Sequence, residues 1–210
     1  SKLIFFNIIL FGSYPKYTLL NVIFFIDLIL YLLFSTCLSK TQTGSGKSTI
    51  INLICRLYET SDPSSKVEIN GKNIKEISID SLRKSISIVP QNIMVFDMSI
   101  KDNVVLNNKY DPVKFKSIMK MMVLKNYNKN ANELSLGQKQ RVIIARTLYQ
   151  ENKSVYIFDE YLSAIDDHTA KTIHKFVLNF IKKRNKIGIF ISHNINRIHE
   201  SDKVINLSTN

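Results

Sequence analysis

The chain has 210 residues and a mass of 24.2 kDa, so a single domain is the first expectation. It is 45% hydrophobic and 22% charged, which is enough apolar material for a substantial core and excludes intrinsic disorder as a description of the whole chain. The formal net charge of +12 favours a polyanionic partner, such as a nucleotide, a nucleic acid or an anionic membrane surface, without choosing among them.

The N-terminal part is apolar and punctuated by one turn. Residues 1–38 are short apolar stretches broken at residues 12–15, Gly-Ser-Tyr-Pro, which predicts a strand, a turn and a strand. Two alternatives stay open here. Residues 1–12 faintly resemble a signal peptide, although no small-residue cleavage site follows them. Residues 19–38 have the length of a membrane helix, although Asp27 near their middle would be costly in lipid.

The rest of the chain alternates between helical and strand patterns. Helices are expected over 46–58, 111–125, 137–149 and 167–184, and strands over 67–69 (entering a hairpin turn), 86–89, 155–158 and 187–191. This alternation favours an α/β fold with a mainly parallel sheet, whereas the first third looks more antiparallel.

Neither the cysteines nor the densest basic run predicts a site. Cys37 and Cys55 form no disulfide framework and no zinc-binding pattern, so both are expected to be reduced core residues. The basic run at residues 182–186 is short and is expected to be a solvated helix face.

One segment has the composition of a phosphate-binding loop: Thr43, Gly44, Ser45, Gly46, Lys47, Ser48 and Thr49. Glycines let backbone N–H groups close around phosphate oxygens, and the following helix adds its positive N-terminal dipole. Lys47 would reach the β- and γ-phosphates, and the Ser48 hydroxyl would ligate Mg²⁺. The full pattern wants glycine at position 41, where this chain has Thr41, so a turn that merely caps a helix is the alternative.

An acidic pair follows the apolar strand expected at residues 155–158. Ligands bind at the carboxyl ends of strands in open α/β sheets, and Asp159 and Glu160 stand at such an end. Asp159 would hold Mg²⁺, and Glu160 would polarise the water that attacks a γ-phosphate. A helix N-cap is the structural alternative for this pair.

A third element points to one family of P-loop proteins. Residues 134–141, Leu-Ser-Leu-Gly-Gln-Lys-Gln-Arg, resemble the LSGGQ-x-QR signature of ATP-binding-cassette (ABC) ATPases. Pro90-Gln91 resembles the family's Q-loop, Ser163-Ala164-Ile165-Asp166 its D-loop, and Ser192-His193 its H-loop. The resemblance covers residues 43–207 and is greatest to exporter-type domains, including multidrug and mitochondrial half-transporters.

The resemblance implies a fold and a domain organisation. The expected fold is an α/β ABC-type P-loop ATPase with a mainly parallel core sheet, an antiparallel β part and a helical part with the signature. Residues 1–210 would form one nucleotide-binding domain, with the β part at 1–42 and the helical part at 92–140. Tyr14 would stack on adenine, and the apolar run at 19–38 would then be β-strands.

The resemblance also implies residue roles, with ATP and Mg²⁺ as cofactors. Two domains would pair head to tail, with ATP between the phosphate loop of one and the signature of the other. One half-site would contain Lys47, Ser48, Gln91, Asp159, Glu160 and His193, with Mg²⁺ on Ser48, Gln91 and Asp159. Ser135, Gly137 and Gln138 would complete the site of the partner domain. Arg141 is expected to make a structural ion pair.

The expected partners are the transmembrane domains of an exporter and a second nucleotide-binding domain, with no nucleic acid. The expected location is therefore a membrane, on its cytoplasmic or organellar-matrix face.

Three departures keep other functions open. Residues 26–42 lack the usual strand before the phosphate loop, Thr41 replaces a glycine, and Leu136 replaces the first glycine of the signature. One alternative is a degenerate nucleotide-binding domain with a regulatory role. Another is a non-transport ABC ATPase acting in translation or DNA repair, which the basic charge would suit.

Overall fold

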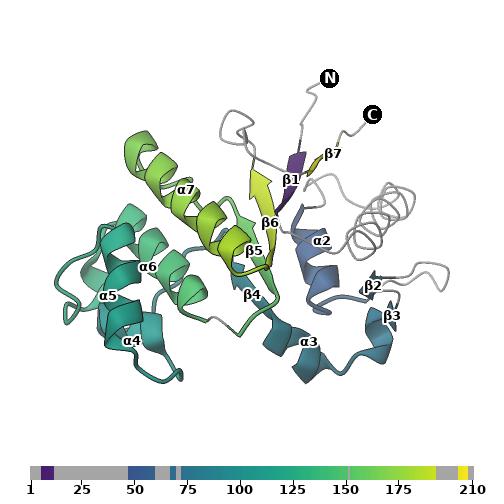
Figure 1. Cartoon of the computed structure of the whole chain (residues 1–210), viewed down its shortest axis with the longest axis horizontal. Coiled ribbons are helices and arrows are strands. Elements are labelled where there is room, and N and C mark those ends of the chain that lie inside the picture. The colour runs from purple at the N-terminus through teal and green to yellow at the C-terminus, as the bar shows by residue number, and fades with distance from the viewer. Residues whose placement is uncertain are drawn as a thin grey trace.

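The fold is taken from a computed structural model, which describes residues 6–11, 47–59, 67–69, 72–150, 152–192 and 203–207 (Figure 1). Its elements in chain order are β1 (Phe6–Phe11), α2 (Lys47–Ile54), β2 (Glu68–Ile69), β3 (Lys72–Asn73), η1 (Ile74–Glu76), α3 (Ile79–Ser85), β4 (Ile86–Val89), α4 (Ile100–Val105), α5 (Pro112–Met121), η2 (Ala131–Glu133), α6 (Leu136–Tyr149), β5 (Val155–Asp159), α7 (Asp167–Lys183), β6 (Ile187–Ser192) and β7 (Lys203–Leu207).

A five-stranded sheet in the order β4-β5-β6-β1-β7 organises the molecule. Strands β4, β5 and β6 run parallel to one another, which confirms the predicted α/β class with a parallel core. Strand β1 runs antiparallel to both of its neighbours, β6 and β7. Strands β2 and β3 pair antiparallel on either side of residues 70–71, as the predicted hairpin requires.

The sheet separates two hydrophobic clusters. Successive strand residues face opposite sides, so Tyr156 and Phe158 of β5 belong to a large cluster with α4, α5, α6 and α7. Ile157, between them, belongs to a smaller cluster with α2 and α3. Phe158 stacks on Phe190 of β6 with ring centroids 4.7 Å apart. This contact helps to hold strands β5 and β6 together near their carboxyl ends.

The predicted helices and strands after residue 46 are found, with shifted ends. Two short helices, α3 and α4, were not predicted, because six or seven residues are too few to show a helical period. Their N-caps are visible in the sequence: the side chain of Ser78 accepts a bond from the N–H of Ser81, and that of Ser99 from the N–H of Asp102. Strand β7 was also missed.

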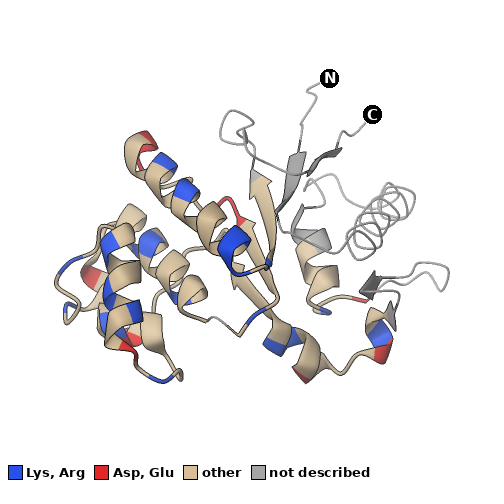
Figure 2. Ribbon diagram, viewed as in Figure 1, with Lys and Arg blue, Asp and Glu red and all other residues tan. Residues whose placement is uncertain are grey.

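The basic run predicted to be a solvated helix face lies at the end of α7. Lys182 and Lys183 are exposed in the last turn, where positive charge complements the helix dipole. Figure 2 shows further basic residues on α3, α5, α6 and α7 rather than on one element.

Several predictions lie outside the described residues: those on Tyr14, Cys37, Thr41, residues 43–46, His193 and the runs 1–5, 19–38 and 26–42. Within the described residues, no helix is both long enough and apolar enough to span a membrane. Cys55 is a buried free thiol, as predicted.

Candidate functional site

Three predicted site residues lie at the carboxyl ends of neighbouring strands because those strands are parallel. The pairing sets Val89 of β4 opposite Phe158 of β5, and Asp159 of β5 opposite Ile191 of β6. Gln91 follows the end of β4, and Glu160 follows the end of β5. The carboxyl ends of parallel strands are where α/β sheets bind ligands, so the structure brings Gln91, Asp159 and Glu160 to that edge.

The acidic pair has a constrained backbone. Asp159 is only 6% exposed, whereas Glu160 is half-buried and adopts a left-handed conformation with φ 48°. Left-handed backbone is uncommon for a residue with a side chain and persists where surrounding bonds hold it. The N–H of Glu160 donates to the carbonyl of Ile191 at 3.0 Å, and its own carbonyl accepts from the N–H of Ser163 at 3.0 Å.

Helix α2 begins inside the predicted phosphate loop. Lys47, Ser48 and Thr49 are its first residues, so their backbone supplies the N–H groups that a helix leaves free at its N-terminus. In Figure 1 this end of α2 lies toward the same end of the sheet as the arrowhead of β6. The side chains of these three residues lie outside what the structure describes, as do residues 43–46.

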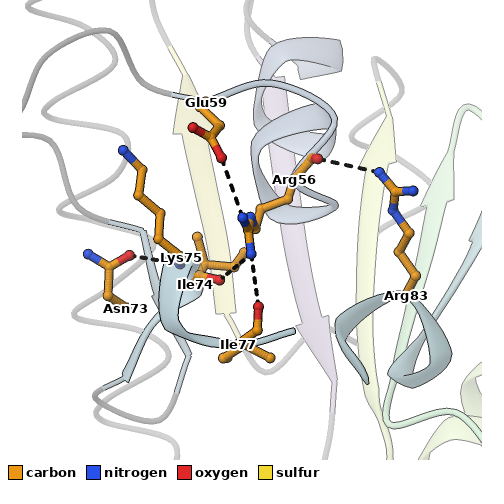
Figure 3. Close-up of polar contacts among 7 residues, drawn as sticks. All are labelled: Arg56, Glu59, Asn73, Ile74, Lys75, Ile77 and Arg83. Atoms are coloured by element: carbon orange, nitrogen blue, oxygen red, sulfur yellow. Dashed lines mark hydrogen bonds and ion pairs between the residues drawn. The ribbon is translucent and has the colours of Figure 1, made fainter. Parts of the chain in front are cut away.

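Arg56 anchors the other end of α2 (Figure 3). Its Nη1 donates to the carbonyls of Ile74 at 3.2 Å and Ile77 at 2.8 Å, and its Nη2 lies 3.4 Å from a carboxylate oxygen of Glu59. The guanidinium thus ties the end of the helix to the η1 segment. These bonds limit how far α2 can shift. They therefore also limit the movement of the N–H groups at its N-terminus.

The signature segment forms the N-terminus of α6. Ser135 is the N-cap: its Oγ accepts from the N–H of Gln138 at 3.3 Å, and the Gln138 side chain accepts from the N–H of Ser135 at 3.1 Å. A hydroxyl that accepts one bond still has a proton to donate, so this capping box leaves Ser135 able to bind an anion. Leu136 is 60% exposed at the first helical position.

Gly137 lets the signature helix approach the loop after β5. A Cβ at Gly137 would lie 2.6 Å from the carbonyl oxygen of Ala164, closer than real Cβ atoms come. The first turn of α6 and the segment 160–165 are therefore in contact within one chain, which brings the signature and the acidic pair to neighbouring positions.

A family model for the ABC transporter matches residues 42–163, which is more than half of the chain. The chain belongs to the ABC transporter family. This match spans the phosphate-loop segment, the acidic pair and the signature, and it confirms the resemblance read from their sequences.

Two relatives of this ABC domain are mitochondrial iron-sulfur clusters transporters. It is 34% identical over 178 residues to the mitochondrial iron-sulfur clusters transporter ATM1 of Saccharomyces cerevisiae, covering 78% of this chain and 25% of that protein. It is 33% identical over 179 residues to the mitochondrial iron-sulfur clusters transporter ABCB7 of Rattus norvegicus, covering 79% of this chain and 23% of that protein. The chain spans about a quarter of the length of these relatives.

A solved structure has the same fold. It is a bacterial Atm1-family ABC exporter with ATP bound, similar at a TM-score of 0.67 and 29% identity over 75% of this chain and 29% of that one. The ABC ATPase fold predicted from the motifs is thereby confirmed.

The ion pair expected for Arg141 of this ABC domain is replaced by bonds to main-chain carbonyls. Its Nη1 donates at 3.0 Å to the carbonyls of Met122 and Val123, and its Nε donates to that of Gly137 at 3.3 Å. Burial lowers the pKa of Arg141, and the nearby charge of Asp166 opposes that shift. Helix ends leave carbonyls unpaired, and a guanidinium satisfies several at once.

A buried amide that sequence reasoning missed shapes the segment after Gln91. Asn103 is fully buried, and its Nδ2 donates to the carbonyls of Phe96, Met98 and Ser99 at 3.0–3.1 Å. Arg146 of α6 donates to Asn103 Oδ1 at 2.7 Å. The missed signal was the Asn at position 103, directly before the apolar pair Val104-Val105.

The residues proposed for Mg²⁺ fit that ion in their donor chemistry. Asp159, Gln91 and Ser48 carry carboxylate, amide and hydroxyl oxygens, the hard donors that Mg²⁺ prefers. Among the described residues there is no cluster of three or more His, Cys, Asp or Glu side chains. Mg²⁺ is commonly bound by one or two carboxylates together with the phosphates of a substrate, and a site with one carboxylate suits that kind of binding.

Proposed function

We propose that this chain is the nucleotide-binding domain of an ABC exporter, and that it hydrolyses ATP while paired head to tail with a second such domain. The observation that carries the proposal is that Gln91, Asp159 and Glu160 follow or end neighbouring parallel strands at their carboxyl ends, and that the signature helix packs against the loop after β5. Hydrolysis needs an oriented water and a stabilised phosphate, and this edge offers groups for both.

Within one half-site, each residue has a distinct role. Lys47 and the N–H groups at the start of α2 bind the phosphates, and Glu160 accepts the proton of the attacking water. Ser48, Gln91 and Asp159 would hold Mg²⁺, which would supply positive charge to the phosphates. His193, which follows Ser192 at the end of β6, donates a hydrogen bond to the γ-phosphate. Tyr14 stacks on adenine, and residues 43–46 and Thr49 surround the phosphates.

The signature serves the site of the partner domain. The Ser135 hydroxyl donates to the γ-phosphate of the nucleotide held by the partner, with Gly137 and Gln138 lining that surface. The N-terminal dipole of α6 points at the same phosphate and favours its negative charge. Both half-sites therefore need two domains in contact.

The partners we propose are the transmembrane domains of the exporter and a second nucleotide-binding domain, on the cytoplasmic or matrix face of a membrane. Met94 and Phe96, just after Gln91, are 67% and 46% exposed and offer apolar contacts to a partner. We treat residues 1–210 as one nucleotide-binding domain, with 1–42 its β part and 92–140 its helical part.

The alternatives gain no support. ATM1 of yeast and rat ABCB7 are transporters, so neither favours a role in translation or DNA repair. Leu136 is exposed and disturbs no packing of its own chain, so it bears on the partner's site and on whether the two domains are identical.

Light scattering on purified Glu160→Gln chain, with and without ATP, tests the proposal together with an ATP titration and phosphate release by the unaltered chain. We expect phosphate release only from the unaltered chain, and an ATP-dependent dimer of the variant. Binding without dimerisation would point to a different partner chain. Failure to bind ATP, or equal phosphate release by both proteins, would overturn the proposal.

A further inference from the structure

Gln140 is a buried polar residue that the roles above do not use. It lies in the second turn of α6 and is only 1% exposed. A buried amide is destabilising unless its donors and acceptor are paired. Its hydrogen-bond partners therefore show what the residue holds in place.

All of its described partners lie in the loop that carries the acidic pair. Gln140 Nε2 donates to the carbonyl of Glu160 at 3.2 Å and to Ser163 Oγ at 3.3 Å. Gln140 Oε1 accepts from the N–H of Ala164 at 2.9 Å. One side chain thus bonds three residues that lie 20–24 positions further along the chain.

The same loop touches α6 one turn earlier, at Gly137. Because a Cβ there would lie 2.6 Å from the Ala164 carbonyl oxygen, helix and loop are closely packed at this point. The absence of a side chain at Gly137 lets the helix and the loop come close together. The hydrogen bonds of Gln140 fix which loop residues lie opposite the helix. Two independent contacts therefore join the signature helix to residues 160–164.

The contacts between the signature helix and the loop matter because they support the unusual backbone conformation of Glu160. At φ 48° its backbone needs outside support, and a peptide rotation there would redirect the carboxylate. The Glu160 N–H is held by Ile191 on the sheet, and its carbonyl by Ser163 and Gln140. Gln140 is the member of this set that comes from the signature helix.

We propose that Gln140 is a positioning residue for ATP hydrolysis, holding the main chain of Glu160 in the conformation that aims its carboxylate at the attacking water. The inference rests on the proposed function. Since Ser135, Gly137 and Gln138 of α6 serve the partner's nucleotide, Gln140 also links the two sites of the dimer through one chain.

Gln140→Met tests the inference on the purified chain, because it keeps the size of the side chain and removes its hydrogen bonds. Thr147→Val is the matched control: Thr147 is buried on the same helix and bonds the carbonyl of Ile88 at 3.3 Å, away from Glu160. We expect Gln140→Met to lower kcat about tenfold or more, which corresponds to about 1.4 kcal/mol, with ATP affinity within about twofold. Thr147→Val should keep kcat within about twofold.

Ser163→Ala provides a second variant that keeps the buried amide. Ser163 is exposed, and its loss removes only one acceptor of Gln140. We expect a drop in kcat of about threefold, and a double variant no worse than Gln140→Met alone, because the two residues act through one bond. Independent, multiplying effects would contradict this linkage.

Three outcomes overturn the inference. The first is a Gln140→Met chain with unchanged kcat, and the second is a parallel loss of ATP affinity and kcat, which a purely structural role would produce. The third is an equal effect of Thr147→Val. A failure of the proposed function is distinguishable, because the unaltered chain would then release no more phosphate than Glu160→Gln.

Discussion

The backbone N–H of Glu160 donates a hydrogen bond of 3.0 Å to the carbonyl of Ile191, joining the turn after β5 to the end of β6. The two strands are parallel, and Asp159 stands opposite Ile191 in their pairing. His193 follows Ile191 by two positions in the sequence. The placement of the acidic pair therefore depends on the end of a strand that lies some thirty residues further along the chain.

Gly137→Ala should destabilise the fold. The added Cβ would meet the Ala164 carbonyl oxygen at 2.6 Å, and main-chain atoms cannot move aside as a flexible side chain can. We expect the free energy of unfolding to fall by about 1–3 kcal/mol, as overpacking does elsewhere, measured by urea denaturation. Leu136→Ala, at the exposed neighbouring position, should change it by less than about 0.5 kcal/mol. Equal stability of Gly137→Ala and the unaltered chain would show that the contact is looser than described.

Arg56→Met should loosen the end of α2. The substitution keeps most of the aliphatic stem and leaves the carbonyls of Ile74 and Ile77 without their donor. A loss of about 1–3 kcal/mol in the free energy of unfolding is expected. Arg83→Met is the control, because within the described part of the chain the Arg83 side chain makes one hydrogen bond, an exposed one of 3.5 Å to the Arg56 carbonyl. A larger effect of the control would contradict the anchoring role.

Tyr161→Phe removes a partly buried hydrogen bond made by the residue that follows the acidic pair. The Tyr161 hydroxyl and His174 Nδ1 are 2.5 Å apart, joining the loop after β5 to α7. We expect a loss of about 1 kcal/mol in the free energy of unfolding, measured by thermal or urea denaturation. Tyr110→Phe, at a position 41% exposed, serves as the control and should be close to neutral. A neutral Tyr161→Phe would mean that the bond contributes nothing to folding.

Cys55 should be unreactive in the folded chain and should make stability fall at high pH. Burial raises the pKa of its thiol from 9.0 to about 11, with the Arg83 charge partly opposing the shift. The folded state thus favours the neutral thiol, so this stabilisation is complete below about pH 9 and is lost as the pH rises toward 11.

The measurement is alkylation of Cys55 at pH 8 in a chain carrying Cys37→Ser. Labelling should be slow until urea unfolds the protein, and the unfolding midpoint should fall between pH 8 and pH 10.5. Cys55→Ala in the same background removes this contribution and should flatten the fall. Fast labelling of the folded chain would contradict the buried position.

The sequence alone predicted those parts of the protein whose signals are local. A short stretch of sequence is enough to recognise the strand over 155–158 with its two acids, the helix after Gly137 and the signature motif. The spacing of apolar residues and the capping residues that reveal them involve near neighbours in the chain. The family, the parallel core and the position of Gln91, Asp159 and Glu160 at strand ends followed from such stretches.

Tertiary structure decided what depends on contacts between distant residues. Nothing near Gln140 in the sequence identifies Glu160, Ser163 and Ala164 as its partners, because those bonds form only when α6 packs against the loop after β5. Arg141 was expected to meet a carboxylate and instead meets carbonyls, since the end of α5 brings Met122 and Val123 to it. Strand β1 likewise finds its neighbours β6 and β7 at the far end of the chain. Hydrogen bonds are satisfied by whichever groups packing brings within reach, and only the folded chain determines which groups those are.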